Sequence, residues 1–139
     1  MLNRRNPHTV KYPRIDPNPI DNDLKTPLHY AVSFDHAAAA SALLSAPAIA
    51  INLQDMDGLT PLHWAGRNGR AELVDLLLEM PSIRYSLRDH NDMTAADWAK
   101  HNGYLELVPR LTSKNYKAHF LKRFWEYALT RFKQVWNRE

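Results

Sequence analysis

A six-residue segment recurs in this chain at a fixed spacing of 34 residues. It reads Thr-Pro-Leu-His-Tyr-Ala from Thr26, Thr-Pro-Leu-His-Trp-Ala from Thr60 and Thr-Ala-Ala-Asp-Trp-Ala from Thr94. Each threonine can cap a helix, and in the first two copies a proline follows at the first helical position, where no N–H is needed. Because units of this length bury one face against the next unit, the period predicts stacked helix-turn-helix repeats.

The middle copy resembles the ankyrin-repeat family. The residues that match the family pattern are Asp55, Gly58, the tetrapeptide Thr60 to His63, Ala65, Gly69, Val74, Leu77 and Leu78. The third copy departs from the pattern at Ala95, Ala96 and Asp97, and Leu24 and Asp92 stand where the middle copy has the turn glycine Gly58. The resemblance covers residues 21–111, and it implies an all-α solenoid of three repeats with short hairpin loops.

Charge divides the chain into three parts. Residues 1–20 carry four basic and one acidic side chain, residues 21–109 carry six and twelve, and residues 110–139 carry eight and two, which gives +3, −6 and +6. We therefore expect an arm over 1–20, a repeat domain over 21–111 (21–54, 55–88 and 89–111) and a C-terminal segment over 112–139. An acidic body with basic tails suggests that the tails contact something that the body does not, or fold back on it.

The N-terminal arm contains four prolines among its first twenty residues, which favours an extended, polyproline-like structure over a helix. Its basic character fits a mitochondrial transit peptide, but such a peptide should also be helical and rich in serine, so we favour a structural arm. The chain has no cysteine, which fits an intracellular protein, cytoplasmic or organellar, and it has no apolar run of about 20 residues that could span a membrane.

Residues 115–136 contain no helix breaker and predict one long basic amphipathic helix. Its apolar face is wider than a single contact seam requires. We expect the first turns, around Phe120, Leu121 and Phe124, to cover the open end of the third repeat. The later turns, with Trp125, Phe132 and Trp136, should extend beyond the stack and bind a partner protein, a membrane surface or, least favoured, nucleic acid. The predicted apolar face comprises Leu121, Phe124, Trp125, Ala128, Phe132, Val135 and Trp136.

No motif in the chain indicates catalysis. Two of the seven histidines, His29 and His63, belong to the repeated tetrapeptide, and in the family that the chain resembles this imidazole braces its own turn. The spacing of the histidines matches no zinc-binding motif, and the sequence contains no glycine-rich phosphate loop and no nucleophile elbow. We therefore predict a protein that is not an enzyme and needs no metal or cofactor.

Three aromatic residues, Tyr30, Trp64 and Trp98, occupy one phase of the repeat and should form a ladder that mainly serves packing between repeats. The resemblance also implies a concave binding face made of hairpin tips and first helices. The residues expected to bind a partner there are Phe34, Met56, Leu59, Arg67, Asn68, Arg88, His90, Met93 and His101. Phe34, Met56, Leu59 and Met93 are apolar at positions where the fold does not require it, which suggests a protein partner.

The sequence thus predicts a non-catalytic interaction scaffold, docked through its tails into a larger assembly as an accessory subunit. The alternative is a soluble adaptor, or an effector directed at a host, that captures one protein on its concave face while the tails only cap the stack. A binder of membrane surfaces or nucleic acid through the C-terminal helix is a third, less favoured hypothesis.

Overall fold

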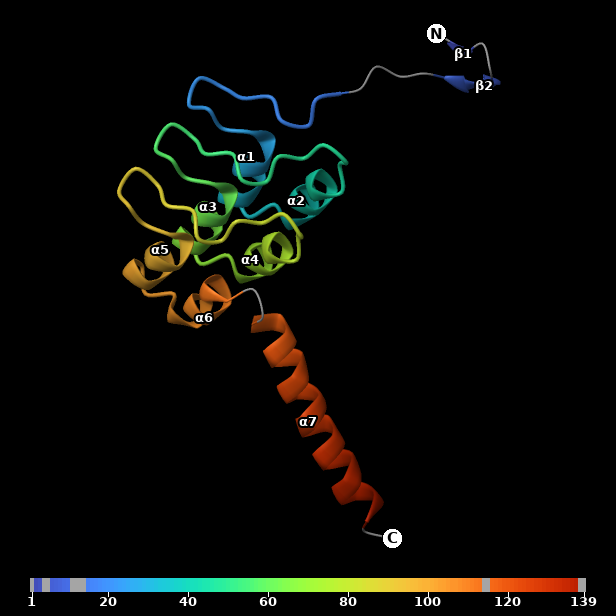
Figure 1. Ribbon diagram of the computed structural model, residues 1–139, viewed down its shortest axis with the longest axis vertical. Coiled ribbons are helices and arrows are strands. Elements are labelled where there is room, and N and C mark those ends of the chain that lie inside the picture. The colour runs from blue at the N-terminus through green and yellow to red at the C-terminus, as the bar shows by residue number, and fades with distance from the viewer. Residues whose placement is uncertain (1, 4–5, 11–14, 114–115, 138–139) are drawn as a thin grey trace.

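The computed structural model describes residues 2–3, 6–10, 15–113 and 116–137. Figure 1 shows two neighbouring rows of short helices. The first row is α1 (Pro27–Ser33), α3 (Pro61–Arg67) and α5 (Ala95–His101). The second row is α2 (Ala37–Leu44), α4 (Ala71–Leu78) and α6 (Val108–Thr112), and a 3₁₀ turn, η1 (Leu105–Leu107), precedes α6. The predicted solenoid of helical hairpins is confirmed.

Each first helix begins at the repeated threonine because the side chain supplies the missing partners of the first turn. The hydroxyl of Thr60 accepts the backbone N–H of His63 at 3.3 Å, and the ring of His63 accepts the backbone N–H of Thr60 at 3.1 Å. Thr26 with His29 and Thr94 with Asp97 form the same reciprocal pair. Two of the orphan donors at each helix start are thereby satisfied, which fixes the phase of every repeat.

Leucines from successive repeats form one continuous core between the two rows. The leucines that solvent does not reach include Leu28, Leu62, Leu73, Leu77, Leu107 and Leu111. Small residues line the contact between first helices: Ala65 and Ala99 are completely buried, and a Cβ added to Gly66 would lie 2.6 Å from the carbonyl oxygen of Ala95. Since α3 packs on both α1 and α5, the middle repeat is covered on both sides.

The third repeat closes the stack with its own second helix. Leu107 and Leu111 are buried against the core, and η1 and α6 pack on α5. Pro109 lies in the first turn of α6, where its missing N–H costs no hydrogen bond. Arg110 ties α6 to α4 through a salt bridge of 3.1 Å to Asp75.

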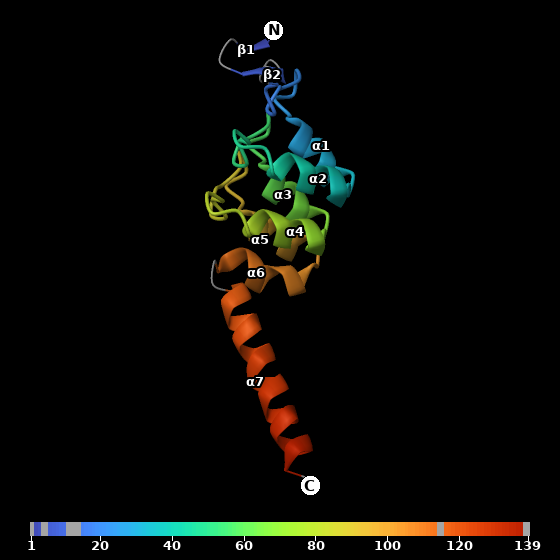
Figure 2. The ribbon, with the colours of Figure 1, turned by 90° about the vertical axis from the view of Figure 1, so that its right-hand side faces the viewer.

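The long helix α7 (Tyr116–Trp136) is confirmed, but its Phe124 does not cover the third repeat as predicted. In both views it starts near α6 and points away from the stack (Figures 1 and 2). The ring of Phe124 is 57% exposed, so the prediction that it covers the repeat is wrong, because α6 already occupies that position. The side chains of Phe120 and Leu121 lie outside what the structure describes.

In the described part of the arm, the side chain of Asn18 is hydrogen-bonded to the stack. Asn18 donates to the carbonyl of Ala48 at 2.7 Å and accepts the N–H of Ala50 at 2.8 Å. Farther toward the N-terminus, β1 (Leu2–Asn3) and β2 (Asn6–Val10) pair antiparallel, a ribbon that the proline content did not predict. Among the described helices, none has the length and apolar character needed to cross a bilayer.

Candidate functional site

The first helices and hairpins present a continuous ladder in which rings alternate with cations. The ammonium of Lys25 lies 5.8 Å from the ring centre of Tyr30 and 5.1 Å from that of Trp64. The guanidinium of Arg67 lies 5.4 Å from Trp64 and 4.7 Å from Trp98. Each cation therefore lies within reach of two rings from adjacent repeats, a contact worth about 0.5–1 kcal/mol at a partly exposed site.

An aspartate at the start of each hairpin holds the ring of the same repeat. Trp64 donates its indole N–H to Asp55 at 2.9 Å, and Trp98 donates to Asp89 at 2.7 Å. The Tyr30 hydroxyl donates to Asp21 in the same way. The second carboxylate oxygen of each aspartate accepts two backbone N–H groups of the hairpin, so one side chain orients both the loop and the ring.

These hydrogen bonds lower the pKa of two of the three carboxylates, Asp21 and Asp89. The donated bond from Tyr30 is the main cause of a lowered pKa at Asp21, with the backbone N–H of Lys25 contributing next. Burial would raise the pKa of Asp89, but hydrogen bonds from Met93, Trp98 and Asn91 outweigh burial, and the pKa lies below 3.8. These aspartates are therefore ionised structural acceptors at neutral pH.

The ladder brings together three of the predicted binding residues. Phe34 stacks on Tyr30 with ring centres 6.2 Å apart, His101 meets Trp98 edge-on at 5.9 Å, and Arg67 lies between the two indoles. We call this surface the ladder face. Its residues are Lys25, Tyr30, Phe34, Trp64, Arg67, Trp98 and His101.

Sequence reasoning missed the role of Lys25. The 34-residue period predicted that the three rings lie one repeat apart. It did not predict which residues fill the space between the rings, because these occupy other positions of the repeat. Lys25 precedes α1 and yet reaches the ring of Trp64 in the next repeat. Only the geometry of the stack brings these two side chains together.

Two of the other predicted residues, Arg88 and His90, take part in the local structure of the hairpins. Arg88 donates to the carbonyl of Asp92 at 2.7 Å and lies within 4.0 Å of Asp97. The N–H of His90 donates to the carbonyl of Asp57 at 3.1 Å and thereby joins neighbouring hairpins. Of the remaining three, Met56 is 55% exposed at a hairpin tip, whereas Met93 and Asn68 are half-buried.

One predicted binding residue is wrong. Leu59 is 2% exposed, and its carbonyl accepts a hydrogen bond from His29 of the preceding repeat at 3.0 Å. The equivalent positions of the first and third repeats hold Lys25 and Met93. In the middle repeat the fold requires an apolar side chain at this position, because neighbouring hairpins cover the middle hairpin on both sides. Leu59 therefore belongs to the contact between repeats and offers no side chain to a partner.

The two repeat histidines are structural, and each reaches farther than its own turn. Because the N–H of Thr60 donates to Nδ1 of His63, Nε2 carries the proton and donates to the carbonyl of Met93 at 3.0 Å. Burial is the main cause of a lowered pKa at both His29 and His63. Within the described residues, no group of three or more histidine or acidic side chains is arranged to hold a metal.

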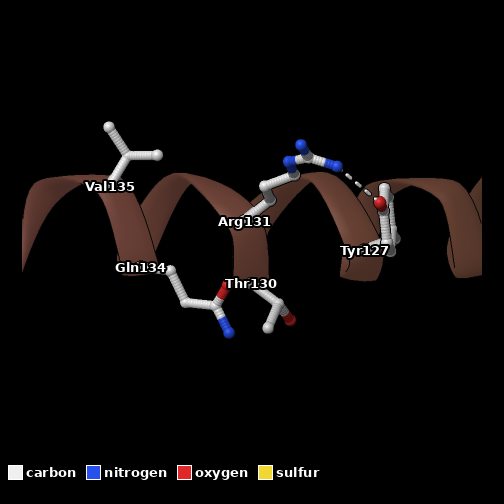
Figure 3. Close-up of a pocket in the computed structure, with 5 residues that line it drawn as sticks. All are labelled: Tyr127, Thr130, Arg131, Gln134 and Val135. Carbon is white, nitrogen blue, oxygen red and sulfur yellow. Dashed lines mark hydrogen bonds between the residues drawn. The ribbon is translucent and has the colours of Figure 1, made fainter.

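The second candidate surface is the outer side of α7. Trp125, Phe132 and Trp136 are 63%, 65% and 72% exposed, and the last two rings stack with centres 6.0 Å apart. A shallow depression on this helix is lined by Tyr127, Thr130, Arg131, Gln134 and Val135 (Figure 3). Only one helix forms it, and Arg131 donates to the Tyr127 hydroxyl across it at 2.8 Å. This depression is too open to enclose a small molecule.

Comparison with known families identifies the repeats. The model of three consecutive ankyrin repeats matches residues 48–122, and the model of a single ankyrin repeat matches residues 23–56. Together the matches cover all six helices of the stack and extend into α7. A search of curated proteins finds no match to the chain.

Proposed function

The chain belongs to the ankyrin-repeat family, whose repeats are protein–protein interaction modules, and on this basis we propose that it is a scaffold docked into a larger assembly. In this proposal residues 21–111 form the repeat domain that holds a protein, and residues 112–139 attach the scaffold to a second surface. In the same proposal the arm helps to cover the first repeat through its residues 15–20, where Asn18 is hydrogen-bonded to Ala48 and Ala50.

The observation that carries the proposal is the exposure of the α7 rings. Three large rings, Trp125, Phe132 and Trp136, face solvent on a helix that leaves the stack (Figure 2). If each ring loses about 150 Å² of apolar surface to a partner, the gross gain is about 11 kcal/mol at about 25 cal/mol per Å². This gain is of the same order as the cost of association, about 4–15 kcal/mol, so the three rings can supply a large share of the binding free energy. An apolar surface of this kind on a monomer marks an interaction site.

A second candidate function is capture of one protein target on the ladder face, as an adaptor or effector would do. The ladder supports it because aromatic rings lie side by side across all three repeats with Arg67 between two of them, and aromatic residues and arginine are enriched in protein interfaces. Phe34, a member of this face, is 65% exposed, and Met56, at a hairpin tip, is 55% exposed; neither side chain belongs to the core.

Two sets of substitutions separate these functions. The tagged full-length chain would be expressed in its native cells, cross-linked, and analysed by the mass of the complexes on a native gel. Trp125→Ala with Trp136→Ala tests docking through α7, and Phe34→Ala with Met56→Ala tests capture on the ladder face. Leu105→Ala is the matched control, because this leucine is exposed but belongs to neither surface.

We expect the α7 pair to shift the chain from the large complex to the free monomer, while Leu105→Ala behaves like the unmodified chain. Loss of the complex only in the Phe34 and Met56 pair would favour the adaptor. A complex that survives both pairs would refute the scaffold proposal. Thermal unfolding of each variant shows whether the repeats remain folded.

A further inference from the structure

We propose that the second surface is a lipid bilayer, and that α7 lies in the plane of an anionic membrane with its aromatic face among the acyl chains. This inference rests on the proposed function in one respect, since both treat α7 as a docking element. It goes beyond the proposed function because it identifies the surface that α7 binds as a lipid surface of negative charge.

The apolar side chains of α7 form a single broad face. At about 100° per residue, those from Phe124 to Trp136 fall within an arc of about 140°. All of the large ones are more than half exposed, namely Phe124, Trp125, Leu129, Phe132, Val135 and Trp136. A coiled-coil seam is narrower than this, whereas a helix lying in a membrane interface buries a face of this width.

Cations border this face on both sides. On the helical wheel Lys122 and Lys133 follow Leu129 along one border, and Arg131 precedes Phe124 along the other, next to Tyr127 (Figure 3). Long basic side chains at these positions can reach lipid headgroups while their alkyl parts remain in the apolar layer. Tryptophan and tyrosine are also the residues enriched at the depth of the headgroups.

The charge of the helix favours a lipid surface over a second copy of the chain. Residues 116–137 carry five basic residues and one acidic residue, Glu126, which gives a net charge of +4. Two such helices packed together would repel, whereas anionic headgroups attract each basic residue close to the surface. The single acid lies beyond Lys133 on the wheel, farther from the apolar arc.

The placement of α7 leaves this face accessible along its whole described length. The helix has 21 residues, about 32 Å, and it points away from the repeats in both views (Figures 1 and 2). The repeats therefore do not obstruct a flat surface that contacts Trp125 at one end of the face and Trp136 at the other. Docked in this way, the scaffold would hold a protein partner next to the membrane.

The test is binding of the full-length chain to sedimented lipid vesicles. One set is made of phosphatidylcholine alone, and the other contains about 30% phosphatidylserine to supply negative charge. We expect much stronger binding to the anionic vesicles. Trp125→Ala with Trp136→Ala should lower it at least about tenfold, and Lys122→Gln with Lys133→Gln should lower it about tenfold.

The matched control is Thr130→Ala with Gln134→Ala, two substitutions on the polar side of the same helix, which should change binding less than twofold. Phe34→Ala with Met56→Ala should also bind vesicles normally. This variant therefore separates loss of protein capture on the ladder face from loss of membrane binding through α7. Wild-type protein that ignores anionic vesicles would overturn the inference. Unchanged vesicle binding by the variant Trp125→Ala with Trp136→Ala would overturn it as well. If that variant nevertheless lost the large complex in cells, α7 would bind a protein and not a membrane.

Discussion

The ring of His63 joins two repeats, since its Nε2 donates to the carbonyl oxygen of Met93, thirty residues away, at 3.0 Å. His29 makes the same bond to Leu59 in the middle repeat, also at 3.0 Å. In the third repeat Asp97 takes the place of the histidine and keeps the local cap to Thr94, at 2.9 Å. Among the described residues no further hairpin packs on α5, so Asp97 makes the cap of its own helix without a bond to a following repeat.

These histidines make stability depend on pH. Burial holds their folded pKa values below 6.5, so an unfolded chain binds protons first as the pH falls. Their contribution is therefore complete above about pH 6.5 and declines as the pH falls toward the folded pKa. We expect the free energy of unfolding in urea to decrease from about pH 7 to about pH 5.

His36→Gln provides the control for this pH dependence, because that histidine is exposed and makes no side-chain cap. Its substitution should leave the slope in place. A free energy of unfolding that is constant across this range would contradict the assigned roles of His29 and His63.

Leu24 has a strained backbone. Its φ of +59° lies in the left-handed region, which costs a residue with a side chain about 1–2 kcal/mol. The side chain is 44% exposed, so its removal costs little packing. Leu24→Gly should therefore raise the free energy of unfolding by about 1 kcal/mol, measured by urea titration. A lower urea midpoint for Leu24→Gly than for the unmodified chain would show that the packing of the leucine side chain contributes more to stability than its exposure suggests.

The equivalent glycine of the middle repeat gives the opposite prediction. Gly58 has a φ of +79°, and an added Cβ would lie 2.7 Å from Cδ2 and 2.8 Å from the backbone N of His90. Gly58→Ala should lower the free energy of unfolding by about 2 kcal/mol, through backbone strain and displacement of the next hairpin. Near-equal stability with the unmodified chain would argue against this packing.

Trp98 contributes to stability through packing and through one hydrogen bond. The indole is half-buried, lies 4.7 Å from the Arg67 guanidinium and donates to Asp89. Trp98→Ala should cost about 2 kcal/mol, less than a fully buried ring would. Trp98→Phe keeps most of the packing and should cost about 1 kcal/mol. If Trp98→Ala leaves the thermal midpoint in place, the ring serves binding alone.

Removal of α7 should leave the repeats intact. A chain that ends at Ser113 keeps α6, and with it the buried side chains of Leu107 and Leu111. Its thermal midpoint should match that of the full chain. A chain that ends at Gly103 loses both leucines and should not fold, because its last repeat would expose a stacking surface. A large drop in midpoint on deletion of residues 114–139 would restore the capping role that we first expected for the helix.

Metal should not affect folding. We expect a chelator to leave the unfolding curve unchanged, because a structural metal would contribute its binding free energy to stability. Elemental analysis of protein purified without a metal affinity tag provides the second measurement. One zinc ion per chain would show that the histidines do more than hold the repeats.

The sequence determined the repeats because their signals are local. The threonine caps, the proline at the start of the first helix and the 34-residue period act within one hairpin, and they predicted α1, α3 and α5. The same period relates Asn18 to Asn52, which accepts the N–H of Arg84 as Asn18 accepts that of Ala50. That signal was present in the sequence, and the arm's contact with the stack could have been predicted from it.

Only the tertiary structure decided what lies between repeats and at their end. Leu59 is buried because two neighbouring hairpins cover it, and Lys25 meets Trp64 because stacking brings together residues that no helical spacing relates. The direction of α7 likewise follows from the prior occupation of the end position by α6, whose own short sequence carries little helical pattern. Such contacts depend on which surfaces remain free after the repeats have packed, and a pattern confined to one repeat contains no information about that.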